Sequence, residues 1–295
     1  MTSETSAALP AVIVISSHVV RGSVGGRPEI FALESLGFPV WAVPTIVLGW
    51  HPGHGRSTRI VPPADQFSAL LADLEQAPWL DEVGAVLSGY FGSPEQAEAV
   101  ALLVKAVKQR NPRALYVCDP VLGDYAEGLY VQEKTAAAVR DLLMPLADIA
   151  TPNRFELEWM TGTPLADLKS TIKAAVAAAP TTMLVTSAPS MIADGIANLL
   201  VDQKDAILAE HRIVQNPPKG TGDLTCATFL ARLLSGQSPE KALQSATATV
   251  YEAVARAAKR GSDELQLHLD AQSLSHPMAM VQMRTLLHPS RKRKA

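Results

Sequence analysis

The sequence predicts an α/β fold, a three-layer α/β/α sandwich with a mainly parallel central sheet. Short apolar runs rich in β-branched residues alternate with segments of helical periodicity, and this alternation is typical of βαβ units. A chain of 295 residues with 47% hydrophobic residues is long and apolar enough for one large domain. We expect a disordered leader at residues 1–10, a single domain at 11–277, and a C-terminal tail at 278–295 with a basic end.

The first βα unit is expected at residues 11–37. Residues 11–16 form a short apolar run that predicts a buried strand. A glycine-containing loop follows, and it begins at Ser17. A helix is then expected at about residues 28–36, closed by Gly37.

A second strand is predicted at residues 40–44, followed by a loop at 45–59 that is too rich in glycine and proline for a helix. This loop contains His51 and His54. Two histidines can suggest a metal site, but no third ligand has a suitable spacing. We therefore favour a substrate-covering or interface loop.

The next segment predicts helix, strand, helix and strand in turn. Residues 64–76 are amphipathic, and 85–88 form a short apolar run. The second helix is expected at 94–110, because Ser93 offers an N-cap and is followed by proline at the first helical position. Residues 115–118 are the next predicted strand.

Residues 132–144 predict another helix, and 149–150 end a strand that leads into a further helix start. Asn153 and Glu156 lie three residues apart there and share one face of the first turn. Glu156 is therefore placed to reach a metal or a phosphate-side water, although acidic residues at helix starts are also common for dipole reasons.

The last part of the domain predicts a strand at 183–186 and a hairpin of residues 196–201 and 206–214. Helices are expected at about 223–234 and 239–258. No element is assigned beyond residue 277.

Composition and charge exclude several classes of function. The chain has 26 Lys and Arg and 29 Asp and Glu, so its net charge of −3 argues against a nucleic-acid partner. No apolar run approaches the ~20 residues of a membrane span, and the first residues lack a signal-peptide pattern, so we expect a cytoplasmic protein without membrane contact. The two cysteines, Cys118 and Cys226, are predicted to be buried packing residues.

Polar side chains follow two of the predicted strands. Ser17 follows the strand at 11–16, and Asp119 follows the strand at 115–118. Ligands of parallel α/β sheets bind beyond the carboxyl ends of the strands, so both residues are placed to touch one. A carboxylate such as Asp119 can meet a phosphate-bound magnesium directly or through water. The alternatives are a turn-forming serine and an aspartate that caps the turn before Pro120.

The motif Gly220-Thr221-Gly222-Asp223 stands at the start of a predicted helix. Its glycines let backbone N–H groups converge, and the free donors and dipole of a helix start favour an anion. A carboxylate beside that anion can take a proton from an oriented hydroxyl, as phosphoryl transfer to an alcohol requires. The alternative is an ordinary helix entrance with Asp223 as N-cap.

These features occur in a fixed order, and the chain carries the stretches SSHVVRGSVGG, LSGYFGS, CDPVLGD, PLADIATPNRFELE and GTGDLTCATFLARLL. With them the sequence resembles the ribokinase-like superfamily and, within it, the pyridoxal kinases, from about residue 11 to 277. The resemblance implies a ribokinase-like fold and transfer of the ATP γ-phosphoryl group to the 5′-hydroxyl of pyridoxal, which gives pyridoxal 5′-phosphate in vitamin B6 salvage. Members of this family are typically homodimers that need Mg²⁺ and respond to K⁺ or Na⁺.

The resemblance also implies roles for residues at matching positions. Asp223 would be the general base, and the backbone of Gly220, Thr221 and Gly222 would form an anion hole. The substrate side would comprise Ser17, His51, Pro52, Tyr90 and Asp223. The nucleotide side would comprise Asp119, Asp124, Thr151, Glu156, Thr186, Ser187 and Thr221, with Asp119 and Glu156 on the metal.

The chain departs from the family pattern at two positions. Gly26 stands where the family usually has asparagine, and Pro52 stands where it usually has threonine. Each change removes polar contacts that are able to shift affinity by ~1 kcal/mol, so the preferred B6 form stays open. Two alternatives also stay open: a hydroxymethylpyrimidine kinase of the same fold, and a B6-binding protein without catalysis.

Overall fold

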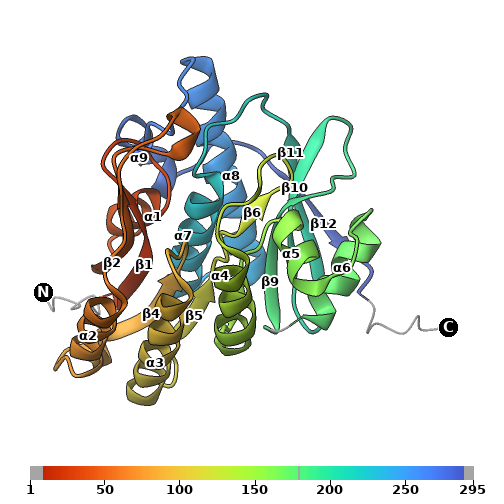
Figure 1. Ribbon diagram of the computed structural model, residues 1–295. Helices are drawn as coiled ribbons and strands as arrows, with labels where there is room; N and C mark the ends of the chain where they lie inside the picture. The colour runs from red at the N-terminus through yellow and green to blue at the C-terminus, as the bar shows by residue number, and fades with distance from the viewer. Residues whose placement is uncertain (1–8, 179, 289–295) are drawn as a thin grey trace, which may run out of the picture.

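The computed structural model describes residues 9–178 and 180–288, and a ten-stranded sheet forms its centre (Figure 1). The strand order is β12-β11-β10-β9-β8-β5-β4-β1-β2-β3. The strands are β1 (Ala11–Val19), β2 (Val40–Leu48), β3 (Arg59–Ile60), β4 (Val83–Ser88), β5 (Leu115–Cys118), β8 (Ile149–Ala150), β9 (Thr182–Ala188), β10 (Gly195–Val201), β11 (Ala206–Arg212) and β12 (Gln282–Leu286).

The central strands of this sheet run parallel, and the outer strands pair antiparallel. Strands β2, β1, β4, β5, β8 and β9 form the parallel part. Strand β3 on one side and β10, β11 and β12 on the other are antiparallel to their neighbours. The predicted mainly parallel sheet and the predicted hairpin are both confirmed.

Helices cover both faces of the sheet. They are α1 (Gly26–Ser35), α2 (Ala64–Glu75), α3 (Pro94–Arg110), α4 (Glu133–Ala138), α5 (Arg154–Thr161), α6 (Leu168–Ala177), α7 (Thr221–Leu234), α8 (Pro239–Lys259) and α9 (Leu267–Ser275). Because successive strand residues face opposite sides, the molecule has two large cores. Ile13 and Ile15 pack with α2 to α6, whereas Val12 and Val14 pack with α1, α7, α8 and α9. This arrangement is the three-layer sandwich.

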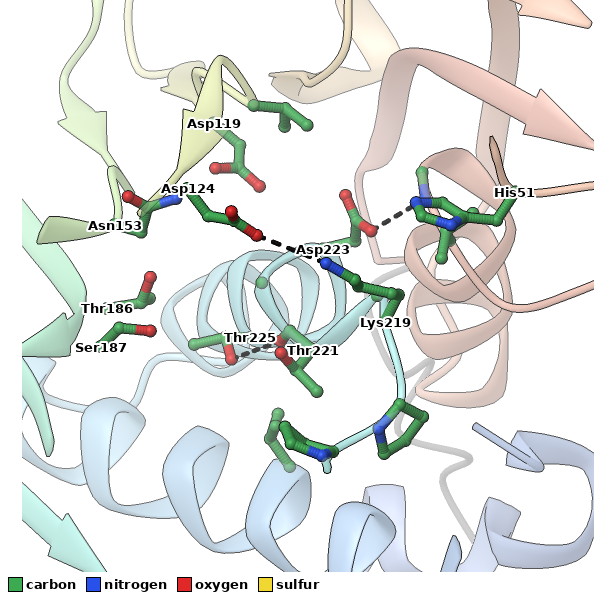
Figure 2. Close-up of a pocket in the computed structure, with 18 of the residues that line it drawn as sticks. His51, Asp119, Asp124, Asn153, Thr186, Ser187, Lys219, Thr221, Asp223 and Thr225 are labelled. Atoms are coloured by element: carbon green, nitrogen blue, oxygen red, sulfur yellow. Dashed lines mark hydrogen bonds and ion pairs between the residues drawn. The ribbon is translucent and has the colours of Figure 1, made fainter. Parts of the chain in front are cut away.

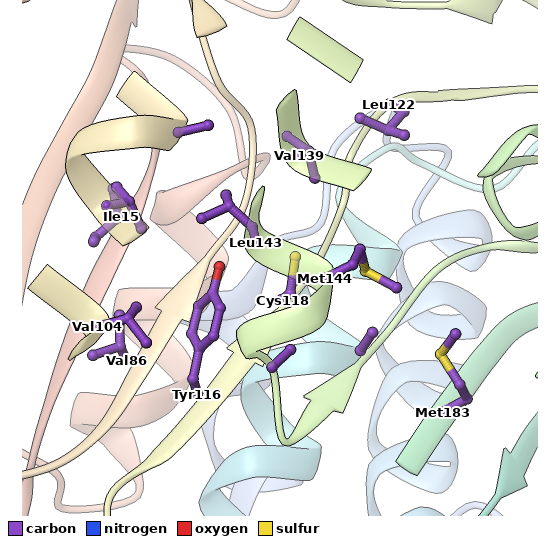
Figure 3. Close-up of a cluster of buried hydrophobic side chains, with 14 of the residues drawn as sticks. Ile15, Val86, Val104, Tyr116, Cys118, Leu122, Val139, Leu143, Met144 and Met183 are labelled. Atoms are coloured by element: carbon purple, nitrogen blue, oxygen red, sulfur yellow. The ribbon is translucent and has the colours of Figure 1, made fainter. Parts of the chain in front are cut away.

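The first of these cores contains one buried polar pair. Figure 3 shows Tyr116 of β5 among side chains such as Ile15, Val86 and Leu143. The Tyr116 hydroxyl lies 2.8 Å from the Ser88 hydroxyl on the neighbouring strand β4. Both side chains are fully buried, and the other polar group beside them is the buried Cys118 thiol, which is a weak hydrogen-bond partner.

Local sequence signals explain several helix starts. Asn153 caps α5 in a capping box, because its side chain accepts from the Glu156 N–H while Glu156 accepts from the Asn153 N–H. At α3, Pro94 occupies the first turn as predicted, but the Ser93 side chain makes no capping hydrogen bond. Instead Gln96 accepts from the Gly92 N–H at 2.8 Å.

Several strands are longer than the sequence predicts, and β1 and β2 are the clearest cases. Strand β1 continues through Ser17 to Val19, and β2 continues to Leu48, because these ends pair with each other in the sheet. The predicted helix at 132–144 is divided into α4, a π-helical turn at Val139–Leu143 and a 3₁₀ turn at Met144–Leu146. Pro145 has no N–H to donate, which is consistent with the helix changing form there.

Several elements were not predicted, among them α6, α9, the short strand β3 and β12. The expectation of a tail from residue 278 is wrong for β12, because Gln282–Leu286 pairs with β11 and extends the sheet. This edge strand has no continuous apolar run that would have marked it. Residues 1–8 of the predicted leader and the basic cluster at 291–294 lie outside the described residues. None of the helices in the described ranges combines the length and hydropathy that a bilayer crossing requires.

Candidate active site

One cavity of about 940 Å³ collects the residues that follow the parallel strands. It is lined by loop residues after β4, β5 and β8, by residues of β1 and β9, and by the start of α7. Every site residue assigned from the sequence lines this cavity: Ser17, His51, Pro52, Tyr90, Asp119, Asp124, Thr151, Glu156, Thr186, Ser187, Gly220, Thr221, Gly222 and Asp223. The structure therefore brings the two predicted sides together at one place.

The start of α7 requires glycine at position 220. Gly220 is the N-cap with φ of 87°, and a Cβ atom there would lie 1.9 Å from the Ser23 carbonyl oxygen. The helix begins at Thr221, so Asp223 is in its first turn and is not the N-cap. The free N–H groups of this turn point toward the cavity end of the helix, where an anion is favoured.

Asp223 is held by the start of α1. Its Oδ2 atom accepts a hydrogen bond from the Gly25 N–H at 2.8 Å. Gly25 has φ of 62°, and a Cβ atom there would lie 2.1 Å from Ser17 Oγ, so Ser17 and Asp223 both border this one glycine. Burial raises the pKa of Asp223 to about 6, and the Gly25 N–H partly offsets the rise.

Two further buried carboxyl groups line the cavity, one in the loop after β5 and one in the first turn of α5. Asp119 is 5% exposed, and burial together with the charges of Glu156 and Asp223 raises its pKa. Burial raises the pKa of Glu156 to about 7, against hydrogen bonds from backbone N–H groups. These bonds come from Leu122 at 2.7 Å and Asn153 at 2.8 Å. Both Glu156 oxygens are thus already engaged, which favours contact with a metal through water.

A small hairpin of β6 (Gly123–Asp124) and β7 (Gly128–Leu129) borders the same cavity. Lys219, directly before the glycine motif, reaches this hairpin. Its Nζ atom lies 3.3 Å from Asp124 Oδ2 (Figure 2). The same Nζ atom lies 2.9 Å from Glu127 Oε1. The ion pairs tie the hairpin to the chain that enters α7.

The loop with the two histidines covers the other end of the cavity. His51 lines the cavity, and its Nδ1 accepts from the Gly53 N–H at 3.0 Å, so the neutral ring carries its proton on Nε2. Burial, with a smaller contribution from the charge of Lys219, lowers the pKa of His51. His54 turns to Glu264, 3.0 Å away. The two rings are thus held by different partners, and the role of the loop as a substrate-covering or interface loop stays a prediction.

Some lining residues escaped the sequence analysis. For Lys219, the only signal in the sequence is its position directly before the glycine motif. His211 of β11 and Tyr251 of α8 stack with ring centroids 4.3 Å apart, and both line the cavity. No local pattern pairs a strand residue with a helix residue forty positions later.

The comparisons with known proteins agree with this geometry. A family model described as phosphomethylpyrimidine kinase matches residues 65–268. The chain is 33% identical over 271 residues to pyridoxal kinase PdxY of Corynebacterium diphtheriae, covering 90% of this chain and 96% of that one. It is 38% identical over 261 residues to the pyridoxine/pyridoxal/pyridoxamine kinase of Bordetella bronchiseptica, covering 87% and 92%.

Solved structures show the same likeness. Pyridoxal kinase from Leishmania donovani in complex with ADP and pyridoxamine superposes with a TM-score of 0.88 at 26% identity. The match covers 94% of this chain and 100% of that one. A putative phosphomethylpyrimidine kinase from Bacteroides thetaiotaomicron, at 23% identity and a TM-score of 0.82, shares the fold.

Proposed function

The chain belongs to the pyridoxal kinases of the phosphomethylpyrimidine kinase family, and we propose that it transfers the γ-phosphoryl group of ATP to the 5′-hydroxyl of pyridoxal. The products are ADP and pyridoxal 5′-phosphate. One observation carries this proposal: Asp223 lies in the first turn of α7, beside Ser17 and in the same cavity as Asp119. At this place the substrate hydroxyl, the terminal phosphate of ATP and the proposed base would come together.

In the proposed reaction Asp223 is the general base. Above its pKa of about 6 the carboxylate is free to take the proton of the 5′-hydroxyl as that oxygen attacks the γ-phosphorus. The backbone N–H groups of Gly220, Thr221 and Gly222 face the negative charge that develops on the transferred group. Ser17, Tyr90, His51 and Pro52 orient the pyridine ring, so the hydroxyl is held close to the base.

The nucleotide is assigned to the part of the cavity that runs from the start of α7 toward β5, β8 and β9. Asp119, Asp124, Thr151, Glu156, Thr186, Ser187 and Thr221 are the proposed contacts. The donor set there fits Mg²⁺, because Asp119 is buried and the Thr151 hydroxyl is buried without a hydrogen-bond partner. Asp119 would bind the ion directly, and Glu156 would bind it through water. The ion would neutralise negative charge on the phosphates. K⁺ or Na⁺ is proposed on the same acidic side.

A product assay tests the proposal and its alternatives. Purified protein is given Mg²⁺ and ATP with pyridoxal, pyridoxine, pyridoxamine or hydroxymethylpyrimidine, and phosphorylated products are measured. We expect phosphorylated pyridoxal. Because the matching family model is described as phosphomethylpyrimidine kinase, product from hydroxymethylpyrimidine alone would favour that second function. Binding without any product would favour a B6-binding protein.

We further propose a homodimer that works in the cytoplasm, where ATP is available. The support is the resemblance to a family of dimeric enzymes. Light scattering coupled to size exclusion measures the mass of the particle, and a mass near the 31.4 kDa of one chain would contradict the dimer.

A further inference from the structure

Glu29 is a buried acidic residue to which the proposed reaction gives no role. It lies in α1, where its side chain has no solvent exposure. Neither carboxylate oxygen has a hydrogen-bond partner among the described residues. An ionised carboxylate in this position costs several kcal/mol of stability unless a positive group or a proton compensates it.

Two other buried carboxylates lie beside it. Ligand oxygens of Glu29, Asp119 and Asp223 all lie within 4.8 Å of one another. They come from α1, from the loop after β5 and from α7, so packing of three separate elements brings them together. Lys219 lies at the same cavity, but its ammonium group already forms ion pairs with Asp124 and Glu127. Within the described residues, no ion pair therefore balances the three carboxylates.

Two buried hydroxyls point independently to a ligand at this cluster. Ser16 Oγ and Thr151 Oγ1 are buried, and neither has a hydrogen-bond partner in the described residues. The Ser16 hydroxyl lies next to Glu29 and the Thr151 hydroxyl next to Asp119, but neither pair has the geometry of a full hydrogen bond. At Gly89, a Cβ atom would lie 2.5 Å from Ser16 Oγ and 3.4 Å from Glu29 Oε1, so the glycine leaves the space between them open.

The donors are all hard oxygen atoms, which select a hard cation. Three carboxylates and two hydroxyls suit Mg²⁺, Mn²⁺ or Ca²⁺, and their total charge of about −3 suits a divalent ion better than a monovalent one. A spread of up to 4.8 Å between ligand atoms equals about twice a 2.3–2.6 Å Ca²⁺–oxygen bond, so opposite ligands can share one ion. The Cys226 thiol is buried nearby, but burial raises its pKa and a neutral thiol is a poor ligand.

We propose that Glu29, Asp119 and Asp223, with the hydroxyls of Ser16 and Thr151, form a divalent-cation site that fills without nucleotide. This site goes beyond the proposed function, in which the metal arrives with ATP and no role is given to α1. Asp119 and Thr151 are common to both sites, and Asp223 is also the proposed base. Glu29 belongs only to the nucleotide-free site, and Glu156 belongs only to the nucleotide side.

A titration with Mn²⁺ in the absence of nucleotide tests the site. Protein stripped with a chelator is titrated while electron paramagnetic resonance reports free Mn²⁺. We expect one bound Mn²⁺ per chain, displaced by Ca²⁺ or Mg²⁺. Glu29→Gln should weaken binding at least about tenfold, whereas Glu34→Gln, an exposed glutamate of the same helix, should bind as the wild type does.

A thermal readout separates loss of the ion from loss of the fold. Mn²⁺ should raise the Tm of the wild type and of Glu34→Gln, but not that of Glu29→Gln. Should Glu29→Gln fail to fold, Ser16→Ala removes one hydroxyl ligand, and its Mn²⁺ affinity should fall several-fold. The proposal is overturned if the wild type binds no Mn²⁺ without nucleotide, or if the Glu29 or Ser16 variant that folds binds it unchanged. The product assay with ATP is independent of this result.

Discussion

The backbone N–H of Gly25 donates a hydrogen bond to Asp223 Oδ2 at 2.8 Å, across 198 residues of sequence. This contact joins the starts of α1 and α7 and holds the proposed base at the mouth of the cavity. Because Gly25 also adjoins Ser17, the same glycine sets the position of the substrate side relative to the base. Most of the predictions below depend on this arrangement.

Replacing the proposed base should lower the turnover rate strongly but leave the affinity for pyridoxal nearly unchanged. We expect Asp223→Asn to lower kcat by ~10²–10⁴ while the Kd for pyridoxal changes only a few-fold, because a base acts mainly in the transition state. Steady-state kinetics and calorimetric titration measure the two quantities. The exposed Asp65→Asn in α2 is the control. Near-normal turnover of Asp223→Asn would exclude the proposed mechanism.

The reaction should lose rate in acid. Burial raises the pKa of Asp223 to about 6, so below that pH the base is protonated in a growing fraction of molecules. We expect kcat/KM to be level above pH ~7 and to fall about tenfold per pH unit well below 6. Rates from pH 5 to 8, corrected for ionisation of the free substrate, test this. A profile that is flat from pH 5 to 7 would contradict the assignment.

The two glycines of the motif should respond differently to alanine. At Gly220 a Cβ atom meets the Ser23 carbonyl oxygen at 1.9 Å and φ is 87°, so Gly220→Ala should destabilise the fold by roughly 1–3 kcal/mol. At Gly222 nothing lies within 4 Å of the added atom, and alanine favours a helix. Denaturant unfolding should show Gly222→Ala at least as stable as the wild type. Equal losses in both variants would contradict this account.

Lys219 should affect nucleotide binding more than stability. Its ion pairs with Asp124 and Glu127 are partly exposed, and such pairs contribute about 0–1 kcal/mol. Its positive charge beside the anion hole is removed in Lys219→Met, so we expect the KM for ATP to rise about tenfold with little change in Tm. Lys204→Met, at an exposed turn, is the matched control. An unchanged KM for ATP would remove Lys219 from the nucleotide side.

The buried hydroxyl pair in the first core should show strong coupling. Tyr116→Phe and Ser88→Ala each leave the other buried hydroxyl with only the weak Cys118 thiol as a partner, and each should cost about 1–3 kcal/mol of unfolding free energy. The double variant leaves neither unpaired, so its loss should be smaller than the sum of the single losses. A double-mutant cycle from denaturant unfolding measures the difference, and additive losses would argue against the hydrogen bond.

Much of the fold could be predicted because its signals are local. Proline at the start of α3, the Asn153 and Glu156 capping box and the apolar run of β5 each act within a few residues. The edge strand β12 could not be predicted in this way. It is held by pairing with β11, more than seventy residues earlier, and carries no strong pattern of its own.

The sequence by itself determined which chemical groups of the site stand at strand ends and at the start of α7. It could do so because motifs, periodicity and turn residues are properties of short segments. Only the tertiary structure decided that Gly25 binds Asp223, that Lys219 pairs with the hairpin at Asp124, and that Glu29 is buried beside Asp119. These contacts join residues about ninety to two hundred positions apart. Their geometry is set by how whole helices pack on the sheet, and no short stretch of sequence contains that information.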